Sequence, residues 1–299
     1  MSNNAQVARP VPLTVAGGKL VTGSGQPMGA LLVEAGRLSD ESAEQILKIQ
    51  RENGLRFGEV GRALGLLTDD DVRFALSAQF QYSYLTPESN LSRELIAAYQ
   101  PGSAVVEQLR MLRSQLMLRW FDNDKQRKGL AIVSAGAGEG RSYLAANLAI
   151  VFSQLGERTL LVDADLRLPR QHQLFHLGKR AGLSEMLAGR AGPEAVVGIA
   201  ALPHLSVLPA GTVPPNPQEL LGRPGFSRLL QSLGEGFDVV IIDTPPAMAC
   251  ADAHTVAVRA GAALIVARQG SSSIAQLAGF THSLREFGVT LVGSVLNDA

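Results

Sequence analysis

Cysteine is almost absent from this chain of 299 residues, in which Cys250 is the one example. A single cysteine cannot form an internal disulfide bond, so disulfide-stabilised scaffolds are excluded and a reducing compartment is expected. Cys250 lies in the small-residue run PPAMACADA. A cysteine in such a run is more typical of a packed position than of a reactive thiol.

Excess charge and long apolar stretches are also missing. The chain has 27 basic and 27 acidic residues, and this formal net charge of +0 gives no reason to expect binding to nucleic acid or to acidic membranes. No run of about 18 apolar residues is present. Residues 1–26 have no apolar core of the signal-peptide kind, so we expect a flexible tail there. A membrane role would need a separate partner.

Two successive segments near the start of the chain share one pattern. GALLVEAGRLSDESAEQILKIQ begins at Gly29, and GEVGRALGLLTDDDVRFALSAQ begins at Gly58; the two align without a gap. Each has a Gly turn followed by Ser or Thr and then acidic residues, which is typical of a helix start. We predict a small helical repeat domain over residues 27–85 and a linker over residues 86–103.

From residue 104 to residue 299, short apolar runs alternate with helical segments. The predicted strands are GLAIVSA, TLLVDADL, LSVLPAG, DVVIIDTPP, AALIVARQG and TLVGSVLND. Apolar strands that alternate with helices predict an α/β fold, with a mostly parallel sheet covered by helices on both faces. Ligands bind such sheets at the carboxyl ends of the strands.

The stretch SAGAGEGRSY, residues 134–143, lacks the lysine of a phosphate-binding loop. In the pattern G-x-x-x-x-G-K-[ST] a lysine precedes the hydroxyl residue, but here Arg141 precedes Ser142. The stretch still joins a predicted strand to a predicted helix, where backbone amides and the helix dipole favour phosphate. The predicted nucleotide-binding residues are Gly136, Ala137, Gly138, Glu139, Gly140, Arg141, Ser142 and Tyr143.

Carboxylates follow two other predicted strands. Asp163 and Asp165 alternate at the end of LLVDADLR, so their side chains face the same side, and Asp243 ends the apolar run VVIID. A charge at the end of a fully apolar strand is costly unless it meets a cation or a donor. Together with the Ser142 hydroxyl and phosphate oxygens, Asp165 and Asp243 predict a magnesium site.

Four segments carry a specific resemblance. SAGAGEGRS, LLVDADLRLPR, AGTVPPNPQELL and VVIIDTPP resemble the Walker A, Walker A′, Pro-Asn-Pro and Walker B segments of the bacterial tyrosine kinases that control exopolysaccharide chain length. The resemblance covers residues from about 104 to 297. It implies a P-loop NTPase-like sheet, with ATP and Mg²⁺ as cofactors.

The same resemblance implies roles for individual residues. Ser142, Asp165 and Asp243 are expected to hold Mg²⁺, and Asp163 to orient or deprotonate an acceptor tyrosine. Arg141 is expected to take the lysine's role on the β- and γ-phosphates, since guanidinium is always charged and can grip phosphate through two parallel bonds. A guanidinium is bulkier than an ammonium, so a reduced rate is expected.

The helix predicted at EQLRMLR matches the family's E-x-x-R-x-x-R motif, through which neighbouring subunits pack into a ring. Glu107, Arg110 and Arg113 therefore form the expected oligomer interface. The resemblance also implies a transmembrane chain-length protein as partner, and hence a cytoplasmic location with peripheral association at the inner membrane.

The repeat over residues 27–85 resembles the N-terminal domain of type II secretion and pilus-assembly ATPases, which in some members binds cyclic di-GMP. With this N-terminal domain, the whole chain is most similar to chain-length kinases of the EpsG type. The spacer RENGL has the expected length, but Pro27 and Met28 stand where the nucleotide-binding members have Arg-Leu. A structural or docking module and a cyclic di-GMP receptor both remain open.

Two other readings of the ATPase part remain. Partition and cell-division-site ATPases share the fold, but their second loop lysine would stand at Gly136. A nucleotide-gated scaffold without catalysis is favoured by Arg141, and by a sequence that ends at VLNDA where the family has a tyrosine-rich tail. If the chain is a kinase, Tyr82 and Tyr84 are candidate acceptors, while Tyr143 is expected to pack beside the loop.

Overall fold

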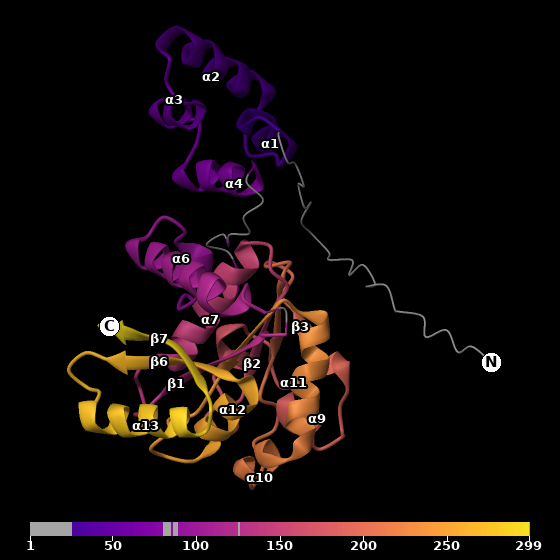
Figure 1. Ribbon diagram of the computed structural model, residues 1–299. Coiled ribbons are helices and arrows are strands. Elements are labelled where there is room, and N and C mark those ends of the chain that lie inside the picture. Colours follow the sequence, from indigo (N-terminus) through magenta and orange to yellow (C-terminus); the bar gives the residue numbers. More distant parts are fainter. Residues whose placement is uncertain (1–25, 80–84, 86–88, 125, 299) are drawn as a thin grey trace. The chain divides into compact units, whose positions relative to one another are not determined.

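The computed structural model describes residues 26–79, 85, 89–124 and 126–298. The chain divides into two compact units, Met1–Gln81 and Tyr82–Ala299 (Figure 1). Residues 1–25 of the predicted tail, together with Tyr82 and Tyr84, lie outside the described residues.

The first unit contains four helices that follow the sequence repeat. They are α1 (Met28–Glu34), α2 (Asp40–Asn53), α3 (Phe57–Ala63) and α4 (Asp69–Gln79). Gly36 and Gly65 occupy equivalent places in the two copies and have φ values of 70° and 67°, a conformation that favours glycine. Ser39 and Thr68, also equivalent, each accept a hydrogen bond on the side-chain oxygen from the backbone N–H three residues later. The repeat in the sequence is therefore a repeat in backbone structure.

The two copies share one hydrophobic core. Its buried members come from all four helices and their turns: Leu32, Leu38, Ala43, Ile46, Phe57, Val60, Leu67 and Ala75. A polar contact also joins the copies, because Arg37 Nη1 lies 3.0 Å from Asp71 Oδ1 and the Arg37 guanidinium lies 4.5 Å from the ring centroid of Phe74. Neither copy buries its apolar face alone.

The second unit is a layered α/β structure. Its strands are β1 (Gly129–Ser134), β2 (Thr159–Asp163), β3 (Val197–Gly198), β4 (Leu205–Leu208), β5 (Val239–Asp243), β6 (Ala262–Arg268) and β7 (Thr290–Asn297). Its helices are α5 (Ile96–Tyr99), α6 (Ala104–Leu116), η1 (Met117–Phe121), α7 (Arg141–Gln154), α8 (Gln171–Leu174), α9 (Leu183–Leu187), η2 (Pro193–Ala195), α10 (Pro217–Gly222), α11 (Pro224–Gly236), α12 (Asp252–Ala260) and α13 (Ile274–Glu286).

The sheet has the order β3-β4-β2-β5-β1-β6-β7. All neighbouring strands are parallel except β3 and β4. The predicted α/β fold with a mostly parallel sheet is thus confirmed. The two-residue strand β3 was not predicted, because it is too short to carry an alternating pattern.

Helices cover both faces of this sheet (Figure 1). Leu130 and Ile132 of β1 belong to a core shared with α5, α6 and α7, whereas Ala131 and Val133 belong to a second core shared with α9 to α13. Successive side chains of β1 therefore point into opposite cores, which explains why its sequence is apolar throughout.

The region predicted as a linker differs from that expectation in its described part. Leu95, Ala97 and Ala98 are buried in the core beside α7. Asn147 of α7 accepts a hydrogen bond from the Ala97 backbone N–H at 2.9 Å and donates one to the Glu94 carbonyl at 2.9 Å. Residues 94–98 pack here because the buried Asn147 side chain provides hydrogen-bond partners for their backbone groups. The local sequence does not reveal this contact.

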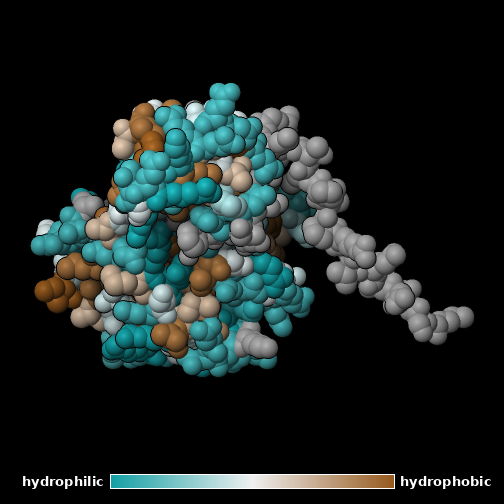
Figure 2. All heavy atoms as spheres, turned by 90° about the horizontal axis from the view of Figure 1, so that it is seen from above, coloured by the Kyte–Doolittle hydropathy of each residue, from teal (hydrophilic) through white to brown (hydrophobic). Residues whose placement is uncertain are grey.

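Hydrophobic and hydrophilic residues are mixed on the visible surface (Figure 2). On the face shown in Figure 2, hydrophobic residues form small separate groups among hydrophilic ones. Within the described ranges, none of the helices is both long and apolar enough to cross a bilayer.

The Asn147 contacts predict a measurable contribution to stability. Asn147→Ala removes three side-chain hydrogen bonds, those with Ala97, Glu94 and Tyr143, and leaves the buried Ala97 N–H without this partner, so the free energy of unfolding should fall by about 1–3 kcal/mol. Urea denaturation followed by circular dichroism measures this change. The exposed Asn90, replaced by alanine in the same way, should stay within about 0.5 kcal/mol of the original chain. Equal stability of the two variants would contradict the packing role of residues 94–98.

Candidate functional site

The Gly-rich stretch forms a tight loop between β1 and α7. Gly138 and Gly140 have φ values of 72° and 96°, which side chains rarely adopt. A Cβ atom at Gly140 would also overlap the side-chain amide of Asn297 at the end of β7. Both glycines are therefore required by the backbone itself, independently of any ligand.

Contacts from β6–α13 and from β7 hold this loop. Glu139 is buried, and its Oε2 accepts a hydrogen bond from the Gly136 N–H at 2.9 Å. The hydroxyl of Ser272 donates to the other carboxylate oxygen, and Asn297 Nδ2 donates to the Glu139 carbonyl at 3.3 Å. The position written as x in the motif thus anchors the loop through its side chain.

Arg141 turns its guanidinium toward the base of the loop. Its Nε donates to the Thr244 carbonyl at 2.9 Å, and its Nη1 donates to the Gly136 carbonyl at 2.6 Å and to the Ser134 hydroxyl. The residue is only 8% exposed. Burial lowers the pKa of the guanidinium, while the nearby Asp243 carboxylate opposes this shift. Contact of Arg141 with phosphate stays a prediction.

The predicted carboxylates gather at the ends of two adjacent strands. Asp163 and Asp243 are direct neighbours in the register of β2 and β5, and both are fully buried; Asp165 is 6% exposed. Asp163 Oδ2 accepts hydrogen bonds from the backbone N–H groups of Arg170 at 3.0 Å and Gln171 at 2.9 Å. The first turn of α8 therefore binds the Asp163 carboxylate.

Burial dominates the electrostatics of this pair. It raises the pKa of Asp163 well above its usual range, and the neighbouring Asp243 adds to the shift. Burial also raises the pKa of Asp243 to about 6, opposed by the Gln171 amide, the Ser142 hydroxyl and the Arg141 charge. Two buried carboxylates this close favour a bound cation or a shared proton.

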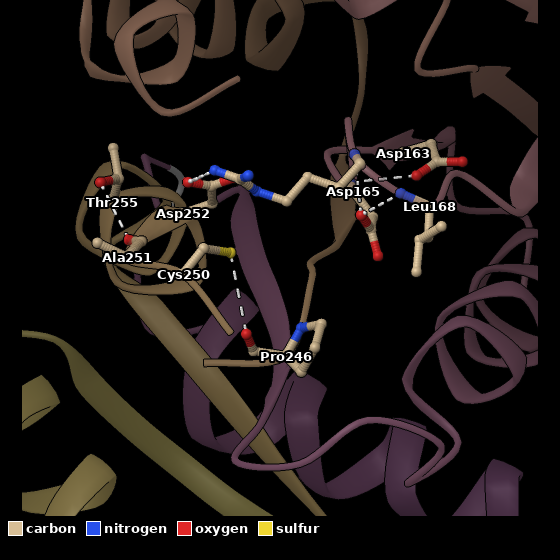
Figure 3. Close-up of polar contacts among 9 residues, drawn as sticks. Asp163, Asp165, Leu168, Pro246, Cys250, Ala251, Asp252 and Thr255 are labelled. Atoms are coloured by element: carbon tan, nitrogen blue, oxygen red, sulfur yellow. Dashed lines mark hydrogen bonds and ion pairs between the residues drawn. The ribbon is translucent and has the colours of Figure 1, made fainter. Parts of the chain in front are cut away.

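The segment after β2 is fixed by local turns and by α12. Asp165 Oδ1 accepts hydrogen bonds from the N–H groups of Arg167 at 3.1 Å and Leu168 at 2.9 Å (Figure 3). Arg167 in turn forms a two-point ion pair with the buried Asp252, at 2.8 and 3.2 Å. Asp165 thus has one oxygen committed to the turn.

The remaining carboxylate contacts bear on the predicted metal site. Asp243 Oδ2 accepts a hydrogen bond from Gln171 Nε2 at 2.8 Å, whereas Asp243 Oδ1 is buried without a partner in the described part of the chain. The described ranges contain no group of three or more His, Cys, Asp or Glu side chains with metal-site geometry. The unpartnered Asp243 Oδ1 is an oxygen that a cation such as Mg²⁺ could contact, since that ion keeps waters and uses few protein ligands.

Cys250 lies outside this chemistry. Its Sγ is 3.9 Å from the Pro246 carbonyl (Figure 3). The side chain is half-buried, and burial raises the pKa of the thiol. A thiol with a raised pKa stays protonated and unreactive near neutral pH.

Two cavities lie near the strand ends. One of about 470 Å³ is lined by Arg167 and residues 215–219, so the Pro-Asn-Pro segment faces the turn after β2. The other, of about 670 Å³, is lined by Lys128, Gly129 and Val240 among others, at the amino ends of β1 and β5. The first cavity lies beside the turn that follows β2, but residues 136–143, Asp163 and Asp243 do not line it.

Other predicted residues lie next to the loop or on α6. Tyr143 is half-buried, and burial raises the pKa of its hydroxyl. On α6, Arg110 pairs with Glu107 at 3.0 Å, and Arg113 Nη1 donates to the Val151 carbonyl of α7 at 2.7 Å. The structure therefore ties Arg113 to its own chain.

Sequence reasoning missed several residues of the site. They are Ser134, Gln171, Thr244, Ser272 and Asn297. Ser134 and Thr244 stand beside motif residues, which is a usable signal. Gln171, Ser272 and Asn297 lie in other segments, where no motif marks them.

Comparisons with known proteins identify the family of this chain. The family model for cellulose biosynthesis protein BcsQ matches residues 128–290. Tyrosine-protein kinase YwqD of Bacillus subtilis is 37% identical over 209 residues, which cover 70% of this chain and 87% of that protein. The chain belongs to the bacterial tyrosine kinase family.

Further relatives of this tyrosine kinase family support the assignment. A putative tyrosine-protein kinase in the cps region of Klebsiella pneumoniae is 32% identical, with 68% of this chain and 28% of that protein covered. The kinase domain of the Escherichia coli tyrosine kinase Etk is 30% identical and superimposes with a TM-score of 0.64, covering 72% of this chain and 84% of that domain. The chain spans less than a third of the longer curated relatives.

The pKa of Asp243 predicts an unusual pH dependence of stability. The folded-state pKa of about 6 exceeds the ordinary value of 3.8, so the free energy of unfolding falls as pH rises between these values and stays lower above pH 6. Asp243→Asn should therefore raise the free energy of unfolding at pH 8, on the order of 1–3 kcal/mol, with little effect near pH 4. Urea titrations at both pH values measure this.

Asp238→Asn is the matched control with the opposite sign. Hydrogen bonds from Arg158 lower the pKa of Asp238, so its carboxylate stabilises the fold above its unfolded pKa. Asp238→Asn should lower the free energy of unfolding at pH 8. If Asp243→Asn lowers it as well, Asp243 is not a buried charge that costs stability.

Proposed function

We propose that this chain is a magnesium- and ATP-dependent protein tyrosine kinase of an exopolysaccharide or capsule export system. The observation that carries the proposal is the meeting of Asp163 and Asp243, both fully buried, at the strand ends beside the Gly-rich loop. The relatives are named as tyrosine-protein kinases, and one is named for a cps region. These names support tyrosine as the acceptor and polysaccharide export as the setting. Phosphoryl transfer needs mainly positioning and neutralisation of charge, which this arrangement can supply.

Each residue has a place in the proposed reaction. Ser142, Asp165 and Asp243 would hold Mg²⁺, which when bound neutralises phosphate charge. Asp163, held by the N–H groups at the start of α8, would orient or deprotonate the acceptor tyrosine hydroxyl. A raised pKa suits a carboxylate that takes up a proton. Arg141 would neutralise the β- and γ-phosphates from the base of the loop.

The second candidate is a nucleotide-gated scaffold that transfers no phosphate. It is favoured by the contacts of Arg141, whose guanidinium is engaged by the carbonyls of Gly136 and Thr244. These bonds use Nε and Nη1 of the guanidinium, so contact with phosphate would fall to Nη2 or would require one of these bonds to break. A lysine has no such fork of donors and would reach the phosphates as a point charge.

Transfer of labelled γ-phosphate to tyrosine tests the kinase proposal. The full chain with Mg²⁺ and the cytoplasmic part of its membrane partner should label tyrosine, and Asp243→Asn should reduce the rate by at least about 100-fold because the metal site is lost. Arg141→Lys should retain or raise the rate. ATP binding without label in the original chain, together with label in Arg141→Lys, would establish the scaffold. Full activity of Asp243→Asn would refute the metal-site assignment.

The acceptor is a tyrosine that can reach a second subunit. The Tyr99 hydroxyl donates to the Leu91 carbonyl at 2.8 Å, and Arg93 stacks on its ring, so Tyr99 is held within its own unit. Tyr143 is half-buried beside the loop. Tyr82 and Tyr84 remain the proposed acceptors.

We further propose that α6 contributes to a homo-oligomeric ring and that the partner is a transmembrane chain-length protein. Glu107 is well exposed, with 63% of its side chain accessible, and pairs with Arg110 on the same helix. Arg113 would act indirectly, by fixing α6 on α7. The ring would place an acceptor tyrosine of one subunit at the loop of the next.

The first unit would serve as a docking or structural module, with cyclic di-GMP binding as its alternative. Arg37 is already committed to Asp71 and Phe74 within the unit. Arg56 is exposed at the start of α3, and with Phe57 it occupies the place in the second copy that Pro27 and Met28 occupy in the first. Calorimetric titration with cyclic di-GMP decides between these roles, and heat of binding that Arg56→Ala abolishes would refute a purely structural module.

Sedimentation tests the ring. Glu107→Ala combined with Arg110→Ala should convert oligomers to monomers in the full chain, because the exposed charged face of α6 is lost. Glu44 and Lys48, on the exposed face of α2 in the first unit, offer a matched double-alanine control that should leave the mass unchanged. Oligomers that persist after the α6 double substitution would refute this interface.

A further inference from the structure

Gln171 is a buried polar residue that no motif predicts. It is the first residue of α8 and is fully buried. Its backbone N–H donates to Asp163 Oδ2 at 2.9 Å. The residue therefore contacts the end of β2.

The side-chain amide of Gln171 joins two other parts of the site. Its Nε2 donates to the Ser142 carbonyl at 3.1 Å and to Asp243 Oδ2 at 2.8 Å. The Ser142 carbonyl can only accept, so the amide nitrogen must face it and the orientation of the amide is fixed. Gln171 thus links the first turn of α7, the end of β5 and the end of β2 through one residue.

Two oxygens beside this link lack donors. Gln171 Oε1 and Asp243 Oδ1 are both buried, and neither has a hydrogen-bond partner in the described part of the chain. Buried acceptors of this kind are rare unless a water or an ion completes them. A water molecule bound to Mg²⁺ would donate a hydrogen bond to Gln171 Oε1, and the ion itself would contact Asp243 Oδ1.

We propose that Gln171 is a positioning residue, which orients the Asp243 carboxylate toward the metal of magnesium-ATP and accepts a hydrogen bond from a metal-held water on Oε1. This inference rests on the proposed nucleotide site. With Oδ2 bound to Gln171, the Asp243 side chain is fixed and Oδ1 remains for the ion. The contact of Gln171 Nε2 with the Ser142 carbonyl fixes the start of α7 relative to the end of β5.

Calorimetric titration of the full chain tests this role. Gln171→Met keeps the length of the side chain but removes the amide, so the affinity for ATP should fall about 10-fold or more with Mg²⁺ present and less than about 2-fold with EDTA. The exposed Gln173 of the same helix provides the matched control, and Gln173→Met should change neither affinity. Gln171→Asn, which retains the amide on a shorter arm, should recover part of the loss.

The outcomes separate this inference from the proposed function. Equal loss of affinity with and without Mg²⁺, or no loss, would overturn the positioning role. If Gln171→Met does not fold, Gln171→Asn should show a smaller loss of the same magnesium-specific kind, because its shorter arm holds the amide farther from Asp243. Magnesium-ATP binding without tyrosine phosphorylation would overturn the kinase proposal alone. Failure of the original chain to bind magnesium-ATP would overturn both.

Discussion

The burial of Asp163 and Asp243 side by side is the constraint on which the rest of the site depends. Two carboxylates at the ends of adjacent parallel strands oppose folding unless donors or cations compensate them. Backbone N–H groups at the start of α8 donate hydrogen bonds to the Asp163 carboxylate, and the Gln171 amide donates one to Asp243. The arrangement retains an unsatisfied acceptor at Asp243, which is a cost in stability that a functional site can carry.

Arginine in place of the loop lysine changes how the loop is built. Lysine would leave the carbonyls of Gly136 and Thr244 without the guanidinium, whereas Arg141 ties both to one side chain. The charge remains next to Asp243 even while the group is engaged. The kinase and scaffold proposals differ in whether this guanidinium also contacts phosphate.

Much of the architecture could be predicted from the sequence, because it rests on local patterns. The alternation of apolar strands and helices predicted the sheet, and the Gly36 and Gly65 turns followed from the repeat. Motifs located Asp163, Asp165 and Asp243 because their residue types and strand ends are distinctive. Gln171 and the packing of residues 94–98 on Asn147 depend on side chains brought together only by the fold. No local pattern distinguishes these amides from exposed ones.

The central claim is that the buried carboxylates are built to receive the cation of magnesium-ATP. Calorimetry at pH 6, in two buffers with different ionisation enthalpies, measures protons released when preformed magnesium-ATP binds. Because burial raises the pKa of Asp243 to about 6, a cation that ionises it should release protons from the original chain, whereas Asp243→Asn should release fewer protons for each magnesium-ATP bound. Equal proton release from the original chain and from Asp243→Asn would contradict the account.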